Sequence, residues 1–152
     1  MVTTQAALTV MAEIQPGHEA PLRRLLEAVG QDAGNNPLVP FSKLPSVHFA
    51  RFFILDAVSD LQGRSLSARL IFLADIDGPS DAFLVSLCNL AAGGLATIYA
   101  HCQGFSAGAD PLFFLRRHTI PIAARYVNTI GRTVQQVHQE AELREAIQAF
   151  LD

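Results

Sequence analysis

The sequence has little cysteine and no excess of positive charge. Its 152 residues include two cysteines, Cys88 and Cys102, both inside apolar stretches, so no disulfide framework is indicated. Eleven basic against fourteen acidic side chains give a formal net charge of −3. This leaves no diffuse positive field for a phosphate backbone and argues against a nucleic-acid partner. Residues 1–10 also lack the pattern of a signal peptide. These absences predict a reduced, cytoplasmic protein.

Charged side chains are missing altogether from residues 82–109. A membrane-spanning helix needs about 20 predominantly apolar residues, whereas polar side chains and the pair Gly93 and Gly94 interrupt this run. We therefore expect two buried helices joined at the glycines, and no membrane association. The chain is 50% apolar, and a single domain of this length can bury about 70% of its unfolded surface without a disulfide or a structural metal.

Hydrophobic periodicity predicts an α+β fold. Alternation with a period of two indicates strands over residues 7–14, 46–56 and 68–77, and helical spacing follows the first and third of them. This order is most of a ferredoxin-like βαββαβ sandwich with an antiparallel sheet. We expect one domain over residues 1–152, in which residues 1–102 form a βαββα core, residues 103–120 an insertion, and residues 121–152 a fourth strand and an extra C-terminal helix.

Two further helices are indicated in the second half of the chain. One is short and apolar (PLFFLRRH, within the insertion), and the other is the C-terminal helix that ends at Leu151. Thr133 and Gln136 have the spacing of a capping box that opens this final helix.

The two faces of the predicted sheet differ in chemistry. The even-numbered face is apolar except for His48, which we interpret as a core histidine, and the helices should pack there. The odd-numbered face mixes large apolar side chains with charges. Its members include Met11, Glu13, Phe49, Arg51, Phe53, Ile71, Leu73 and Asp75. Such a face does not stay in water, so either a second copy of the chain or the 103–120 segment should cover it and enclose a pocket.

Residues 8–26 (LTVMAEIQPGHEAPLRRLL), a strand followed by Pro-Gly-His-Glu and an amphipathic helix, resemble the start of dimeric α/β-barrel proteins. These are ferredoxin-like domains that pair through their sheets, and they include cofactor-independent monooxygenases and haem-dependent peroxidases. The resemblance implies a homodimer that oxidises an aromatic or polyketide-like substrate, with either no cofactor or a haem. The family's axial histidine has no clear counterpart here, and the segment after Cys102 departs from the minimal pattern.

Arg51 is the first candidate for function, because a guanidinium between two phenylalanines can hold a carboxylate or phosphate in a bidentate way. The alternative is a structural ion pair with Asp75 or Glu13. Arg51, Glu13 and Asp75 are therefore the candidate catalytic residues. The candidate ligand contacts are Arg51, Phe49, Phe53, Met11, Leu73 and Tyr126.

The remaining motifs favour structural roles. His101 and Cys102 are neighbours on a helix and point about 100° apart, so they do not form a metal cluster, and no metal site is expected. Residues 104–108 (GFSAG) match the G-x-S-x-G pattern of serine hydrolases, yet a helix precedes them where that motif needs a strand. The sequence thus predicts a domain that binds a small, apolar, anionic molecule, with oxidoreductase activity of the monooxygenase or peroxidase type, or alternatively a non-catalytic oligomerisation or partner-binding module.

Overall fold

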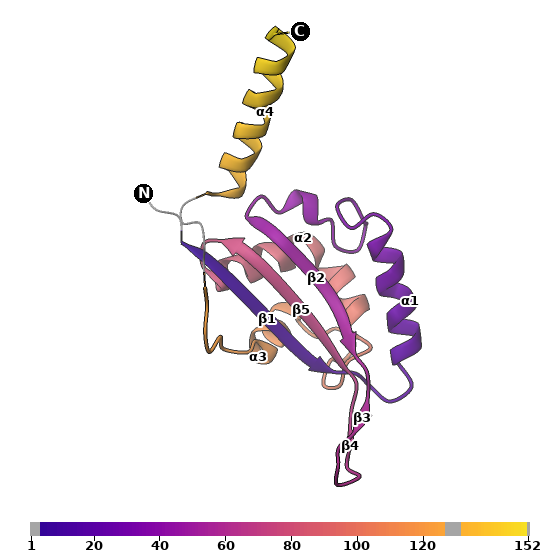
Figure 1. Cartoon of the computed structure of the whole chain (residues 1–152). Helices are drawn as coiled ribbons and strands as arrows, with labels where there is room; N and C mark the ends of the chain where they lie inside the picture. Colours follow the sequence, from indigo (N-terminus) through magenta and orange to yellow (C-terminus); the bar gives the residue numbers. More distant parts are fainter. Residues whose placement is uncertain (1–3, 127–131, 152) are drawn as a thin grey trace.

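The computed structural model describes residues 4–126 and 132–151 and shows an α+β protein (Figure 1). A three-stranded antiparallel sheet has the strand order β1-β5-β2, and a short hairpin of β3 and β4 projects from one end of it. The strands are β1 (Gln5–Glu13), β2 (Val47–Leu55), β3 (Val58–Ser59), β4 (Ser65–Leu66) and β5 (Arg69–Asp77). The helices are α1 (Glu19–Gly30), α2 (Ser80–Tyr99), α3 (Pro111–His118) and α4 (Val134–Leu151), with a short 3-10 helix at Phe41–Lys43.

The three predicted strands are confirmed, and the helices pack on one face of the sheet only. The even-numbered side chains of β1 and β5 are buried against α1, α2 and α3, and Phe52 of β2 stacks on Phe72 with ring centroids 4.6 Å apart. Figure 1 shows α2 and α3 behind the sheet, while its front face carries no helix. By length and composition α2 could cross a membrane, but its buried side chains belong to this core, as in the central helix of a soluble domain.

The predicted fourth strand does not form in the described part of residues 121–128, and residues 127 and 128 lie outside that part. Thr119 makes a single antiparallel bridge to Val10, and the Ile120 amide donates to the Thr9 carbonyl at 2.8 Å. Beyond this point residues 121–126 are all exposed. Because the segment buries no side chains, nothing extends the bridge into a strand.

The 103–120 segment does not cover the odd-numbered face, contrary to one of the two expectations. Its helix α3 packs against α2 and β1, with Phe114 and Leu115 buried, and lies on the helical side of the sheet (Figure 1). Phe114 packs between Tyr99 of α2 and Phe105, with centroids 5.3 and 5.2 Å away. The apolar side chains of this segment are therefore used in the core, and none of its elements shields the open face.

Helix α2 runs through the glycine pair at which an interruption was predicted. Its non-helical residue is Ala91 (φ −131°, ψ 26°), so the kink precedes the glycines. Gly94 is needed for another reason, because a Cβ at this position would lie 1.9 Å from the Leu38 carbonyl oxygen. Gly93, one residue away, has open space around it.

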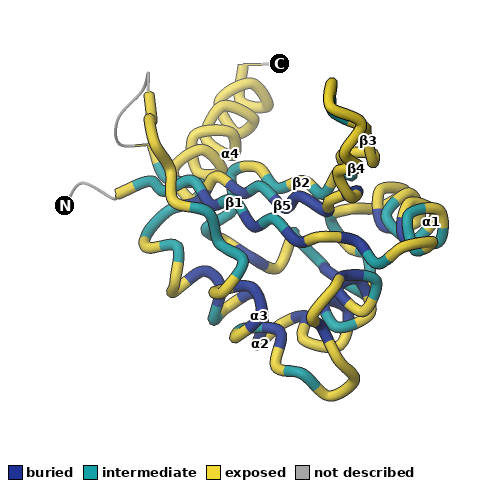
Figure 2. The backbone as a smooth tube through the Cα atoms, turned by 90° about the horizontal axis from the view of Figure 1, so that it is seen from below, coloured by how far each residue is buried: buried dark blue, intermediate teal, exposed yellow. Residues whose placement is uncertain are grey.

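Helix α4 extends away from the body of the protein (Figure 1), and none of its residues is buried (Figure 2). The predicted capping box is confirmed: the Gln136 amide donates to Thr133 Oγ1 at 3.1 Å, and the Thr133 amide donates to Gln136 Oε1 at 2.9 Å. An isolated helix of this length is marginally stable in water, so its start depends on these caps.

The two glycines of α2 give a matched test of the close approach. Gly94→Ala should lower the free energy of unfolding by about 1–3 kcal/mol, the usual cost of overpacking, because the Leu38 backbone must move. Gly93→Ala should instead raise it by about 0.8–1 kcal/mol, since alanine has the higher helix propensity. Urea unfolding measures both changes. Equal effects of the two substitutions would contradict the packing of Leu38 on α2.

Candidate functional site

The odd-numbered face of the sheet carries large apolar side chains, as predicted, and no element of the described chain covers it. Phe49 is 74% exposed, Leu55 48% and Phe53 37%, whereas Ile71 on the central strand is only 5% exposed. The described parts of the chain therefore leave Phe49 and Phe53 of β2 exposed to water. A contiguous apolar patch of this kind marks an interaction or ligand-binding surface.

Strand register arranges this face in rows that run across the three strands. From one end to the other, the rows in the order β1, β5, β2 are Ala7, Asp75 and Phe49; Thr9, Leu73 and Arg51; Met11, Ile71 and Phe53; and Glu13, Arg69 and Leu55. Arg51 and Asp75 thus lie in adjacent rows on adjacent strands. Glu13 lies at the far end, six residues along the strand from the row of Asp75, which is roughly 20 Å.

Two depressions in the open face form one trough. The first, of about 330 Å³, is lined by Phe49, Ala50, Arg51, Leu73 and Asp75. The second, of about 490 Å³, shares Phe49 and Asp75 with it and extends to residues 122–126. Its further polar lining comes from Gln5, Thr9, His48, Arg125 and Tyr126.

The trough brings together five of the predicted site residues: Arg51, Asp75, Phe49, Leu73 and Tyr126. Glu13, Met11 and Phe53 are on the same face but line neither depression. The structural ion pair considered for Arg51 is absent: among the described residues, no ion pair joins Arg51 to Asp75 or Glu13. The guanidinium is exposed, and the arrangement can hold an anion beside an apolar wall.

The prediction that His48 faces the helices is wrong, because the register of β2 shifts between Val47 and Phe49. This bulge puts Val47 opposite Ile76 and turns His48 toward the trough. A bulge re-aims one side chain without changing the rest of the strand. The His48 Nε2 lies 2.9 Å from Asp77 Oδ1, and because this nitrogen donates to the carboxylate, the Gln5 amide nitrogen at 3.4 Å adds little.

Asp77 connects the trough to helix α4. One carboxylate oxygen accepts from His48, and the other accepts from the backbone amide of Val134, the first residue of α4, at 2.8 Å. A carboxylate at a helix N-terminus is favourable because it meets free amide groups and the positive end of the helix dipole. The start of α4 is therefore fixed to the same carboxylate that orients His48.

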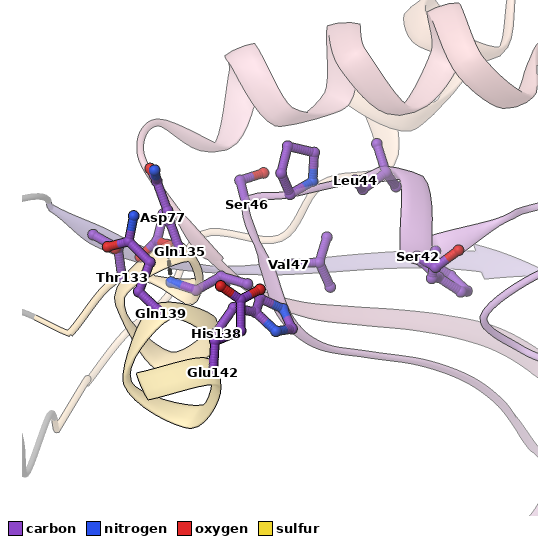
Figure 3. Close-up of a pocket in the computed structure, with 13 residues that line it drawn as sticks. Ser42, Leu44, Ser46, Val47, Asp77, Thr133, Gln135, His138, Gln139 and Glu142 are labelled. Atoms are coloured by element: carbon purple, nitrogen blue, oxygen red, sulfur yellow. Dashed lines mark hydrogen bonds between the residues drawn. The ribbon is translucent and has the colours of Figure 1, made fainter. Parts of the chain in front are cut away.

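A larger hollow, of about 760 Å³, lies between the first turns of α4 and the chain that leads into β2. Figure 3 shows His138, Gln139 and Glu142 on the α4 side and Ser42, Leu44 and Val47 on the other. Asp77 stands at one end of this groove (Figure 3). Its lining includes none of the predicted site residues, so the trough is the candidate site.

Two histidines, His18 and His101, form a pair away from the trough, on the helical side of the molecule. The Nδ1 atoms of His18 and His101 are 3.1 Å apart, so one ring donates and the other accepts. Burial lowers the pKa of His101 below its ordinary value of 6.5, and the charge of His18 lowers it further. Sequence reasoning missed this pair because 83 residues separate the two side chains. Among the described residues, no group of three metal-ligating side chains forms.

The cysteines and the G-x-S-x-G motif have structural roles. Burial raises the pKa of Cys88 to about 11 and of Cys102 to about 12, so both are inert thiols in the core. Ser106 follows a helix, and no hydrogen bond joins it to His118 within the described chain. His118 Nδ1 pairs with the Phe114 carbonyl at 2.8 Å, and Asp110 caps α3 through the Leu112 amide. No nucleophile elbow is formed.

Asp77→Asn tests the link between the trough and α4. Loss of the charged acceptor should lower the free energy of unfolding by about 1–3 kcal/mol and speed hydrogen exchange of the Val134 amide. Exchange followed by NMR, together with urea unfolding, measures both effects. Glu27→Gln, on the exposed side of α1, is the control and should change neither quantity. Unchanged exchange at Val134 would show that Asp77 does not hold α4.

The lowered pKa of His101 predicts how the free energy of unfolding depends on pH. Because its pKa in the folded protein lies below 6.5, the unfolded chain binds more protons, and the free energy of unfolding falls as the pH drops through 6.5. His101→Gln should therefore flatten the decrease between pH 7 and pH 5. His138→Gln, in the exposed helix α4, should leave the decrease as it is. An identical pH profile for His101→Gln and the wild type would contradict this assignment.

The chain matches no known family model, no curated protein and no solved structure. The resemblance of residues 8–26 to dimeric α/β-barrel proteins therefore stays an expectation from the sequence. The distinctive features of the molecule are the open face of the sheet, the trough in it and the guanidinium of Arg51, which forms no ion pair with any of the described residues.

Proposed function

We propose that this protein binds a small, mostly apolar anion in the trough of its open sheet face, and that a second copy of the chain closes the trough. The observation that carries the proposal is Arg51, which is exposed between apolar side chains and forms no ion pair with the described residues. A guanidinium in that setting recognises a carboxylate, sulfonate or phosphate.

The ligand takes its contacts from three strands and from the segment beyond α3. Arg51 anchors the anionic group, Phe49 and Leu73 contact the apolar part, and Tyr126 lines the far wall. Asp75, beside Arg51, accepts a hydrogen bond from a ligand hydroxyl or amide. The carboxylate also disfavours a second anionic group at this position, so a ligand with a single negative charge fits best.

The proposal includes a ferredoxin-like arrangement in a cytoplasmic homodimer. The order β1-β5-β2 is the one that a βαββ unit of this type would have, and the bridge at Thr119 lies on the outer edge of β1, where a fourth strand would pair. The buried free thiols of Cys88 and Cys102 suit a reducing compartment.

The resemblance of residues 8–26 makes oxidation of an aromatic substrate the most concrete activity for such a pocket. Among the trough residues, His48 would be the ligand of a haem iron, through Nδ1, because its Nε2 donates to Asp77 and so orients the ring. Binding of the anion by Arg51 is the part of the proposal that the geometry supports directly.

The second candidate function is a non-catalytic oligomerisation module. It is favoured by the apolar side chains of the face that line neither depression, Phe53 and Leu55, which are exposed without contacting the proposed ligand. In this account the whole face, the trough included, is filled by the partner.

Two dyes distinguish these functions and test Arg51. 8-Anilinonaphthalene-1-sulfonate is apolar and anionic, whereas Nile red is apolar and neutral. Arg51→Ala should weaken binding of the anionic dye about tenfold, which is 1.4 kcal/mol, and leave the affinity for Nile red unchanged. Arg24→Ala, which removes an exposed arginine of α1, is the matched control and should affect neither dye.

Fluorescence titration measures these affinities. Equal affinity of the wild type and Arg51→Ala for the anionic dye would remove the anchor. A wild-type dimer that binds neither dye would favour the oligomerisation module.

A further inference from the structure

The charges on the open face of the central strand are segregated along its length. Arg69 is at one end of β5, Asp75 is toward the other, and Ile71 and Leu73 lie between them on the same face. Arg69 and Asp75 are both exposed, and no ion pair among the described residues joins either of them to another side chain. If a second copy of this surface is turned end to end, each charge lies opposite a charge of the other sign.

We propose that the second copy packs face to face with its β5 antiparallel to the first, about a two-fold axis that crosses β5 at the level of Phe72. This inference rests on the proposed function, which makes the open face a homodimer contact, and it adds the symmetry of that contact. The axis lies between the two sheets and perpendicular to the strands. It sets Arg69 opposite the partner's Asp75 and Ile71 opposite the partner's Leu73.

The flanking strands are complementary under the same operation. Phe52 and Val10 share the row of Phe72, so the axis also crosses β2 and β1 at these residues. On β2, Leu55 then faces the partner's Phe49, and Phe53 faces the partner's Arg51. An arginine can stack on an aromatic ring while its edge still donates hydrogen bonds, so this contact is compatible with anion binding by Arg51.

The other face-to-face arrangement, with the axis parallel to the strands, is unfavourable. It would set Arg69 opposite the partner's Arg69 and Asp75 opposite the partner's Asp75. Like charges brought together at an interface strongly oppose association. The distribution of charge along β5 therefore selects the antiparallel arrangement.

Sheet twist does not remove the pairing. Aligned sheets cross at about 30° and lie about 10 Å apart. Arg69 is three residues from Phe72, about 10 Å along the strand, so the crossing angle displaces it sideways by about 5 Å. The side chain of arginine is long enough to span this shift.

Elements beyond the sheet enlarge the contact. The hairpin of β3 and β4 projects from the Arg69 end of the sheet and exposes Val58, Leu61 and Leu66, while α4 leaves from the opposite end (Figure 1). The antiparallel arrangement brings each hairpin toward the partner's exposed Ile122 and Tyr126. These side chains add apolar area to the strands, toward the roughly 800 Å² per partner of a stable interface, and the hairpin end covers the trough.

Charge reversal tests the axis. Arg69→Asp and Asp75→Arg should each raise the dissociation constant of the dimer at least tenfold, because each sets like charges opposite one another. The double variant should restore it, and so should an equimolar mixture of the two single variants. In that mixed dimer both contacts again pair opposite charges. Arg24→Asp, on α1, controls for net charge and should have no effect, and sedimentation velocity measures all five samples.

Phe53→Lys separates this inference from the proposed function, because it sets a cation opposite the partner's Arg51 under this axis and opposite the partner's apolar Met11 under the other one, and both contacts oppose association. If Phe53→Lys dissociates the dimer while both charge reversals leave it intact, the antiparallel axis is overturned and the homodimer face stands. If Phe53→Lys leaves the dimer intact as well, or if the wild type is monomeric, the open face is not a homodimer contact and both proposals fail. Dissociation by the single charge reversals with recovery in the mixture supports the axis.

Discussion

Helices cover one face of the sheet and leave the other, which is also rich in apolar side chains, without cover from the described chain. The sheet has a single helical layer, so the even-numbered side chains of β1 and β5 pack against α1, α2 and α3, while the odd-numbered ones have no cover from the described chain. Burying that face against a second copy would stabilise it at about 25 cal/mol per Å² of apolar area. All the candidate residues that belong to the strands, Arg51 included, lie on this uncovered side.

The bulge at the start of β2 adds His48 to the side chains on the uncovered face. By turning His48 to the face that carries Asp77, it forms a hydrogen bond that also positions the carboxylate at the first residue of α4. The same carboxylate is one residue from Ile76, which lines the trough. Asp77 therefore connects this end of the sheet to the first residue of α4.

Periodicity was enough to predict the strands and the chemistry of their faces. Alternation in β1 and β5 is regular because one face is buried, and a shift of one residue would reverse it. The same reasoning failed at His48, because a bulge is a local irregularity that alternation does not reveal. It predicted the short helix within residues 103–120 but left open whether that segment covers the odd-numbered face, because an apolar segment can pack on either side of a sheet; helix α3 buries Phe114 on the helical side. Gly94 was singled out as a helix breaker, whereas its role depends on the distant Leu38 backbone.

Hydroxyl-radical footprinting of the unmodified protein can show whether the open face is buried in solution. Within one chain, Phe49 on the open face and Phe113 on α3 are 74% and 66% exposed, so in a monomer both side chains would be oxidised at similar rates. If a second copy covers the face, Phe49 is oxidised several times more slowly than Phe113 at high protein concentration, and dilution removes the difference. Equal rates of oxidation at all concentrations would show that the face stays in water.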